Sequence, residues 1–367
     1  MLAAPYACRA MTGAIAIRDR WPRAGGTGPL VVALVLGLTA VTVFVQYRAL
    51  GHVLPHVDSI GYLQFYELIT HRATLHGTGL DPWTYRILSA WGAEIFLKAA
   101  QGLGFHHWPV VGFVTFRVLQ NVVIFGAFWV LLRRFGFGRR IAALGMVLLA
   151  VAMTQALYDS GVVANTYTDV AVYLVAAILI LDGRYGWIVP LAVVGALNRE
   201  TSGLIPVMLL AVAVVHGLPT PTGRRALRCG IAALAAYAIT TASVRLVIGP
   251  AALFKPFGLS PGLAYAEYNL RSGLTWEYLA RTLNIVPFIA LAGIKRWPRE
   301  LKAFALAIVP AWIVIHLFAS ILAESRLVLV PYAVVFVPGA LFAITASGRP
   351  QHSSLRRDRR DQGSSNG

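Results

Sequence analysis

Long apolar runs separated by short polar segments dominate this chain. The first run covers residues 29–47, and nine more follow at 108–132, 141–157, 168–181, 187–197, 202–215, 229–248, 279–294, 303–318 and 327–345. A helix of about 20 apolar residues crosses the roughly 30 Å hydrocarbon core of a bilayer. The pattern therefore predicts an all-α fold, a polytopic membrane helical bundle of about ten transmembrane helices.

The segment between the first two runs, residues 51–107, has a different character. It holds four of the fifteen acidic residues and six of the nine histidines of the chain. Within it, residues 57–70 and 83–100 mix leucines and aromatic side chains with charges, which are costly at the centre of a bilayer. We therefore expect two amphipathic helices that lie at the membrane interface in this first outer loop, and no further crossing.

Basic residues gather in alternate loops, which predicts the orientation of the chain, because cytoplasmic loops carry an excess of Lys and Arg. Arginines precede the first run, and later clusters are Arg133, Arg134, Arg139 and Arg140; Arg224, Arg225 and Arg228; and Lys295, Arg296, Arg299 and Lys302. We expect a cytoplasmic N-terminal segment at 1–28, a transmembrane domain at 29–346 and a disordered, basic cytoplasmic tail at 347–367.

Composition agrees with a membrane protein and excludes an ordinary soluble domain. The chain is 57% hydrophobic and 13% charged, with a mean hydropathy of +0.67. Its net charge of +17 could indicate a nucleic-acid partner, but topology explains the arginines and no nucleic-acid-binding module is visible. The first 28 residues lack an apolar core before a small-residue cleavage site, so we expect an uncleaved anchor in the plasma (inner) membrane.

One apolar run is too short to cross the bilayer. Residues 187–197 make 11 positions, which at about 1.5 Å per residue reach roughly half of the hydrocarbon core. The polar residues that follow, from Asn198 to Thr201, should then lie below the outer surface. Charges at such depth persist when they are paired or face a wet cavity, so we expect Arg199 and Glu200 to lie in a cavity and not in lipid.

The predicted topology gathers carboxylates and arginines on the outer side. They are Asp58, Asp81, Asp159, Asp169, Glu200, Glu267 and Glu324, together with Arg86, Arg199, Arg271 and Arg326. Arginines bind phosphate oxygens, and carboxylates can transfer protons. This combination suits an anionic lipid head group that undergoes chemistry at the outer face.

Three short stretches carry a resemblance to a known family. They are His56-Val57-Asp58-Ser59-Ile60-Gly61-Tyr62, Pro82-Trp83-Thr84-Tyr85-Arg86, and Glu324-Ser325-Arg326 with Pro331 behind it. With the interfacial helices and the series of spans, the chain resembles the GT-C superfamily of integral membrane glycosyltransferases. It departs from some mannosyltransferases of that superfamily, because Leu327 replaces an aromatic residue, no His-Lys precedes Glu324, and Asp58 stands alone where an acidic pair is common.

The resemblance implies transfer of a sugar from a polyprenyl-phosphate donor to an acceptor on the non-cytoplasmic side. Inversion at the sugar needs a base for the acceptor hydroxyl, and we assign this catalytic role to Asp58. No nucleotide-binding loop is needed, because the sugar arrives activated on a lipid. The alternative is that Asp58 caps a helix that begins at Ser59.

The substrate-binding site is assigned to Arg86, Arg199, Glu200, Glu324 and Arg326, with the arginines on the donor phosphate. Each has an alternative. Arg86 can extend to lipid head groups, Arg199 and Glu200 can form a buried ion pair, and Glu324 can favour a helix start. Glu324 and Arg326 are two positions apart, so we do not expect them to pair with each other.

Further acidic residues and the histidines are expected to be structural. Asp159 and Asp169 flank a short outer loop and are expected to cap helices. The loop histidines match no metal-ligand spacing, so we expect no cofactor, although a divalent metal remains compatible with the sequence.

Two other functions remain in view. A transporter or lipid flippase would need polar groups through the middle of several spans, whereas only Arg117, Arg245 and Arg281 lie within spans away from the outer face. A membrane assembly partner without chemistry would leave Arg199 and Glu200 without a role.

Overall fold

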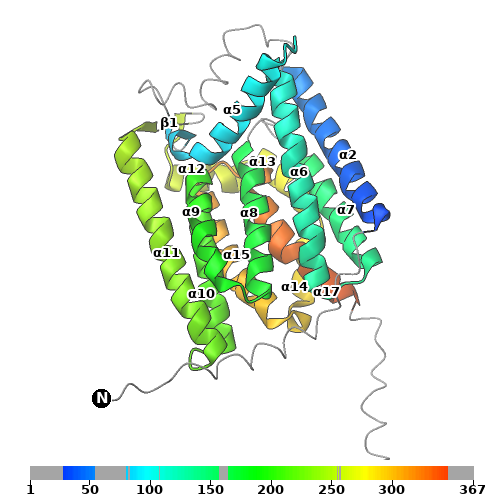
Figure 1. Ribbon diagram of the computed structural model, residues 1–367, viewed down its shortest axis with the longest axis vertical. Coiled ribbons are helices and arrows are strands. Elements are labelled where there is room, and N and C mark those ends of the chain that lie inside the picture. Colours follow the sequence, from blue (N-terminus) through cyan, green and yellow to red (C-terminus); the bar gives the residue numbers. More distant parts are fainter. Residues whose placement is uncertain are drawn as a thin grey trace, which may run out of the picture.

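The computed structural model describes residues 28–53, 80–81, 83–106, 108–156, 164–253, 255 and 258–345. These residues form a helical bundle, which confirms the predicted all-α class (Figure 1). The α-helices are α2 (Pro29–Val53), α5 (Ile87–Gly102), α6 (Trp108–Arg134), α7 (Arg139–Gln155), α8 (Ala164–Leu181), α9 (Ile188–Asn198), α10 (Leu204–His216), α11 (Pro221–Ile248), α12 (Leu263–Arg271), α13 (Gly273–Leu283), α14 (Val286–Ala292), α15 (Arg299–Ala319), α16 (Leu329–Pro331) and α17 (Val337–Thr345).

Short non-α elements join these helices. They are the 3₁₀ turns η2 (Trp83–Tyr85), η3 (Tyr185–Trp187), η4 (Glu200–Gly203), η6 (Ile294–Arg296) and η7 (Ser325–Val328), and the π-helical turn η8 (Tyr332–Phe336). The strands β1 (Leu80–Asp81) and β2 (Ala252–Leu253) pair in parallel over two residues each. This pairing links the segment before α5 to the segment after α11.

Among the described residues, six helical segments are long and apolar enough to cross a membrane. They are Pro29–Gln46, Val110–Arg134, Ala164–Leu181, Pro221–Ile248, Arg299–Ala319 and Ser325–Thr345. Helix α11 also exposes large apolar side chains, such as Leu246 at 84% and Val247 at 85%, as a lipid-facing helix does. These features favour a multi-pass membrane protein, while the count of ten crossings stays a prediction.

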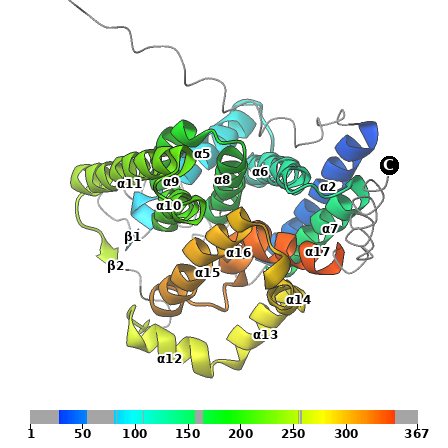
Figure 2. The ribbon, with the colours of Figure 1, turned by 90° about the horizontal axis from the view of Figure 1, so that it is seen from below.

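Aromatic side chains fill the centre of the bundle. The largest fully buried ones include Tyr167 and Tyr173 on α8, Phe125 and Phe128 on α6, and Trp312 on α15. Figure 2 shows α8 near the middle, between the α9–α11 group and α6. This central helix therefore contributes both to the core and to the polar site described below.

The predicted continuous helix over residues 279–294 is wrong. Helix α13 ends at Leu283, Asn284 has a positive φ of 43°, and α14 has only seven residues. Residues with a side chain seldom adopt a positive φ, and at this position the Asn284 Oδ1 accepts a hydrogen bond from the backbone N–H of Val286, 3.1 Å away. Pro287 then fits the first turn of α14 but could not continue α13, because it has no N–H.

Helix α5 confirms a helix over most of the predicted range 83–100, while its place at the membrane interface stays a prediction. It runs obliquely at one end of the bundle, across the ends of α8 and α9 (Figure 1). Its Trp91 and Ile95 are exposed, whereas Ala93 and Leu97 pack inward. The other predicted interfacial helix, over 57–70, lies outside the described residues, as do the segments 1–27 and 346–367.

Candidate functional site

The polar turn between α9 and α10 ends inside the protein. Helix α9 has 11 residues, so it is about 16 Å long, and Arg199 leaves it in an extended conformation with φ −162°. Asn198, Arg199, Thr201 and Ser202 are all buried. Protein surrounds these residues, as the short apolar run predicts.

Close packing at Gly195 fixes this turn against its own helix. A Cβ at Gly195 would lie 2.7 Å from the Cβ of Ser202, which is closer than side-chain carbons approach. Only glycine therefore lets residues 199–203 fold back onto α9 without displacement. The position of the turn depends on this contact.

Asp169 on α8 holds the turn from one side. Its carboxylate is fully buried and accepts hydrogen bonds from the hydroxyls of Thr201 and Ser202, at 2.9 and 2.8 Å. The predicted helix-capping role of Asp169 is wrong, because α8 begins at Ala164, one turn earlier. Asp159, the other predicted cap, lies outside the described residues.

Further hydrogen bonds reach the turn from other helices. Tyr173 on α8 donates to the backbone oxygen of Thr201, and Tyr237 on α11 donates to that of Glu200, each at 2.5 Å. Asn198 accepts from Ser89 on α5 and donates to the backbone oxygen of Asn165, 2.9 Å away. Helices α5, α8 and α11 thus hold the turn in one place.

Glu200 pairs with Arg86 and not with its neighbour Arg199. The Arg86 Nη2 and Nε atoms lie 3.1 and 3.3 Å from the same oxygen, Oε2 of Glu200. The Arg86 side chain is 12% exposed and that of Glu200 is 33% exposed. The pair therefore lies at the edge of the buried turn and links it to the segment that precedes α5.

Arg199 lies between α8 and α15. Its Nη1 donates to the Thr166 hydroxyl at 3.3 Å, and its Nη2 lies 3.5 Å from Nε2 of His316. Because Nδ1 of His316 lies 2.9 Å from the backbone oxygen of Trp312, a proton on Nδ1 leaves Nε2 to accept from Arg199. The Nε atom of Arg199 has no hydrogen-bond partner within the described part of the chain.

Arg326, in η7, belongs to the same region. It is buried, and its charge repels that of Arg199. Its Nη2 lies 2.5 Å from Oε2 of Glu324, so the expectation that these two residues do not pair is wrong. Glu324 precedes the 3₁₀ turn η7 in a non-helical conformation (φ −70°, ψ 65°), so the α-helical spacing that keeps side chains two positions apart does not apply here.

Arg117 on α6 is a buried arginine that sequence reasoning left without a role. Its guanidinium lies 3.5 Å from the centre of the Tyr167 ring, a cation–π contact, and its charge repels that of Arg326. The Tyr167 hydroxyl accepts from Gln46 on α2 at 2.9 Å. The available signal was the position of Arg117 inside an apolar run, since charges within membrane segments are usually functional.

We call Arg86, Arg117, Arg199 and Arg326 the arginine cluster. Among the described residues, the carboxylates near it are Asp169, Glu200 and Glu324, so this part of the group keeps a positive charge even with all three ionised. Asn165 is buried beside Thr166, and its Nδ2 lacks a partner among the described residues. Several donors and excess positive charge suit an anionic group with several oxygen acceptors.

The remaining predicted residues do not join the cluster in the described structure. Asp58 and the histidines His52, His56, His71, His76 and His107 lie outside the described residues. His106 is exposed after α5. Among the described residues, no group of three or more His, Cys, Asp or Glu side chains is placed to hold a metal ion.

Three comparisons with known proteins found no relative of this chain. No protein-family model, curated protein or solved structure matches the chain. Only the residues of the site itself therefore indicate a function.

Proposed function

We propose that this protein is an integral membrane glycosyltransferase. It would transfer a sugar from a polyprenyl-phosphate donor to a hydroxyl acceptor at the end of the bundle where α5 lies. The observation that carries the proposal is the buried Arg199, which lies near Arg326 and has an unused Nε donor. A lipid phosphate brings several oxygens and negative charge to the membrane, which matches these donors.

In this reaction the acceptor hydroxyl attacks the anomeric carbon of the sugar. The bond between that carbon and the phosphate oxygen breaks, and the lipid phosphate leaves with the electron pair. Arg199 and Arg326 would stabilise the developing charge on the phosphate, because fixed donors in a water-poor site need little reorganisation. Asp58, the base predicted from the sequence, would take the hydroxyl proton.

The orientation belongs to the same proposal. About ten crossings with both termini in the cytoplasm would place the arginine cluster on the non-cytoplasmic side of the plasma (inner) membrane. The support is that the helix termini at the opposite end of the bundle carry basic residues, among them Arg133 at the end of α6 and Arg139, Arg224 and Arg299 at the starts of α7, α11 and α15. A GT-C-like architecture, with α5 as one interfacial helix, fits this arrangement.

The rival function is a transporter or lipid flippase. Such a protein needs polar groups along a route between both ends of the bundle. The buried charged residues in the described structure are Arg117, Asp169, Arg199 and Arg326, and the contacts above bring them together near α5. Neutral polar side chains also lie in the middle of the spans, where Asn121 on α6 donates to the Thr42 hydroxyl on α2. The one-sided distribution of charge nevertheless favours a reaction site over a pathway.

Donor consumption separates the two functions. Proteoliposomes would be given polyprenyl-phosphate monosaccharides and a membrane extract as acceptor source, and the lipids would be followed by mass spectrometry. A transferase releases sugar-free polyprenyl phosphate, and this release should fall when Arg199 is changed to Lys. Donors that cross the bilayer intact, with no release of polyprenyl phosphate, would support the transporter instead.

A further inference from the structure

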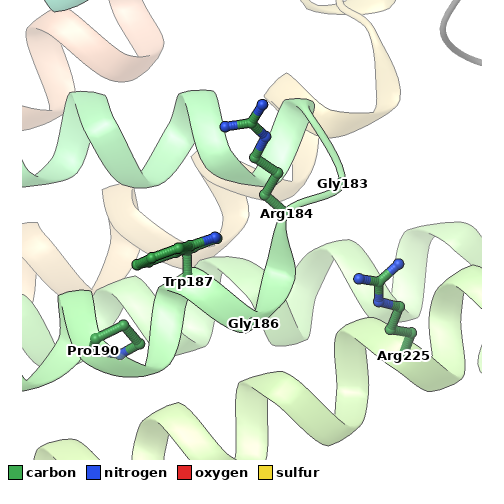
Figure 3. A pocket seen from close by; sticks show the side chains of 6 residues that line it. All are labelled: Gly183, Arg184, Gly186, Trp187, Pro190 and Arg225. Atoms are coloured by element: carbon green, nitrogen blue, oxygen red, sulfur yellow. The ribbon is translucent and has the colours of Figure 1, made fainter.

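An open hollow lies at the opposite end of the bundle from the arginine cluster. The turn after α8, the start of α9 and the first turns of α11 surround this hollow of about 520 Å³. Its lining residues are Gly183, Arg184, Gly186, Trp187, Pro190 and Arg225, shown in Figure 3. The volume is in the range of small-ligand sites, about 300–1,000 Å³.

Two arginines from different elements supply positive charge to this hollow. Arg184 belongs to the turn that follows α8, and Arg225 belongs to the start of α11 (Figure 3). Both are exposed, and neither forms an ion pair with a carboxylate of the described residues. Arg225 lies over the ring of the buried Tyr185, with 6.0 Å to the ring centre, which helps to hold its guanidinium.

The acidic residues nearby already have partners. Asp182 lies 3.3 Å from Arg134, and Glu300 lies 3.2 Å from His216. These pairs leave Arg184 and Arg225 available for an anion from outside the chain. Charge complementarity therefore indicates a negatively charged ligand.

Two glycines and an exposed tryptophan give the hollow the open space and the apolar edge that a lipid needs. A Cβ at Gly183 or Gly186 would meet nothing within 4 Å, so the absence of side chains there keeps the hollow open. Trp187 is 64% exposed and lies on the rim next to Pro190. Exposed tryptophan is typical of the membrane interface, at the level of lipid head groups.

We propose that this hollow binds the head group of an anionic glycerophospholipid from the leaflet at the basic end of the bundle. Arg184 and Arg225 hold the phosphate oxygens, and Trp187 packs against the upper acyl chain and glycerol. Basic pockets between membrane helices bind such head groups, and arginine does so with paired donors. Topology alone explains basic residues at this end, but it does not explain two of them around an open hollow with an exposed tryptophan.

Native mass spectrometry of the full chain in a non-ionic detergent tests this site. Phosphatidylglycerol and phosphatidylcholine would be added at equal concentrations, and the first binding event compared. The wild type should bind phosphatidylglycerol more tightly, and Arg184→Gln with Arg225→Gln should weaken that binding by about tenfold. The matched control is Arg139→Gln with Arg140→Gln, which removes the same charge from exposed positions at the start of α7. These positions lie at the same end of the bundle as the hollow, but on the side away from α9 and α11.

A steric variant tests the hollow without a change of charge. Gly186→Leu should fill the open space and weaken phosphatidylglycerol binding while the protein remains folded. Equal losses in the double variant and in its matched control would overturn the proposal, because they would indicate surface charge alone. Unchanged binding in Gly186→Leu, or competition by soluble glycerol phosphate as strong as by the lipid, would also overturn it.

Discussion

Arg86 and Glu200 lie 114 positions apart in the sequence, yet two nitrogen atoms of the arginine share one carboxylate oxygen of Glu200, at 3.1 and 3.3 Å. Their contact connects the segment before α5 to the buried turn after α9. The candidate site is thus assembled from elements that the sequence alone does not place together.

Loss of this pair should destabilise the protein in a way that a second change repairs. Arg86→Met leaves Glu200 partly buried without its partner and should cost about 1–3 kcal/mol of unfolding free energy. Adding Glu200→Gln should recover at least half of that loss, because no carboxylate then lacks a counter-charge. Thermal melting in detergent measures both variants.

The matched control is Arg271→Met, which breaks the exposed Glu267–Arg271 pair on α12. An exposed pair of this kind contributes roughly 0–1 kcal/mol, so the melting temperature should change little. A fall in melting temperature as large as that of Arg86→Met would show that the Arg86–Glu200 contact stabilises the protein no more than an exposed ion pair does.

Gly195→Ala should displace the polar turn. The added methyl group would lie 2.7 Å from the Cβ of Ser202, and such overpacking costs about 1–3 kcal/mol. Gly126→Ala on α6 is the control, because a Cβ there meets nothing within 4 Å and alanine favours a helix by about 0.5–1 kcal/mol. Melting temperatures should fall for the first variant and stay or rise for the second; equal stability would contradict the close contact.

The predicted orientation can be tested by labelling with a membrane-impermeant thiol reagent. In a background without Cys8 and Cys229, a cysteine at the exposed Ser260 should react from outside the cell, and one at the exposed Gly138 should not. Labelling of Gly138 from outside would reverse the assignment of the two ends.

Asp58→Asn tests the assigned base. Asparagine keeps the shape and the capping ability of aspartate, so expression and donor binding should remain. Loss of a general base should slow turnover by roughly 10²-fold to 10⁴-fold. Sugar transfer at the wild-type rate would show that Asp58 has a structural role only.

Local pattern predicted most of the helices, because an apolar run of sufficient length has few alternatives to a helix in a membrane. It failed at Asn284, where a single residue with positive φ, followed by Pro287, ends the helix inside an apolar run. It also missed the roles of Asp169 and His316. Their partners come from distant helices, and contacts of that kind follow from packing and not from sequence spacing.

The position of the candidate site was predicted from the sequence in part, because local pattern sets helix length, whereas the contacts within the site depend on distant helices. The short run at 187–197 indicated that Arg199 and Glu200 lie inside the protein, since helix length sets depth. Which residue pairs with Glu200 could not be predicted, because Arg86 and Arg199 have the same charge and only the fold decides between them. The contact of the buried Arg326 with Glu324 likewise could not be predicted, because it depends on a non-helical residue followed by a 3₁₀ turn where the sequence pattern predicts the approach to a regular helix.

Binding of the lipid phosphate to the arginine cluster tests the central claim most directly. Affinity for a polyprenyl phosphate would be measured for the wild type, Arg199→Lys and Arg326→Lys, with the exposed Arg281→Lys as control. Lysine keeps the charge but cannot present two parallel N–H donors, so both cluster variants should bind about tenfold more weakly while remaining folded. Wild-type affinity in both cluster variants would contradict the assignment of the phosphate to this site.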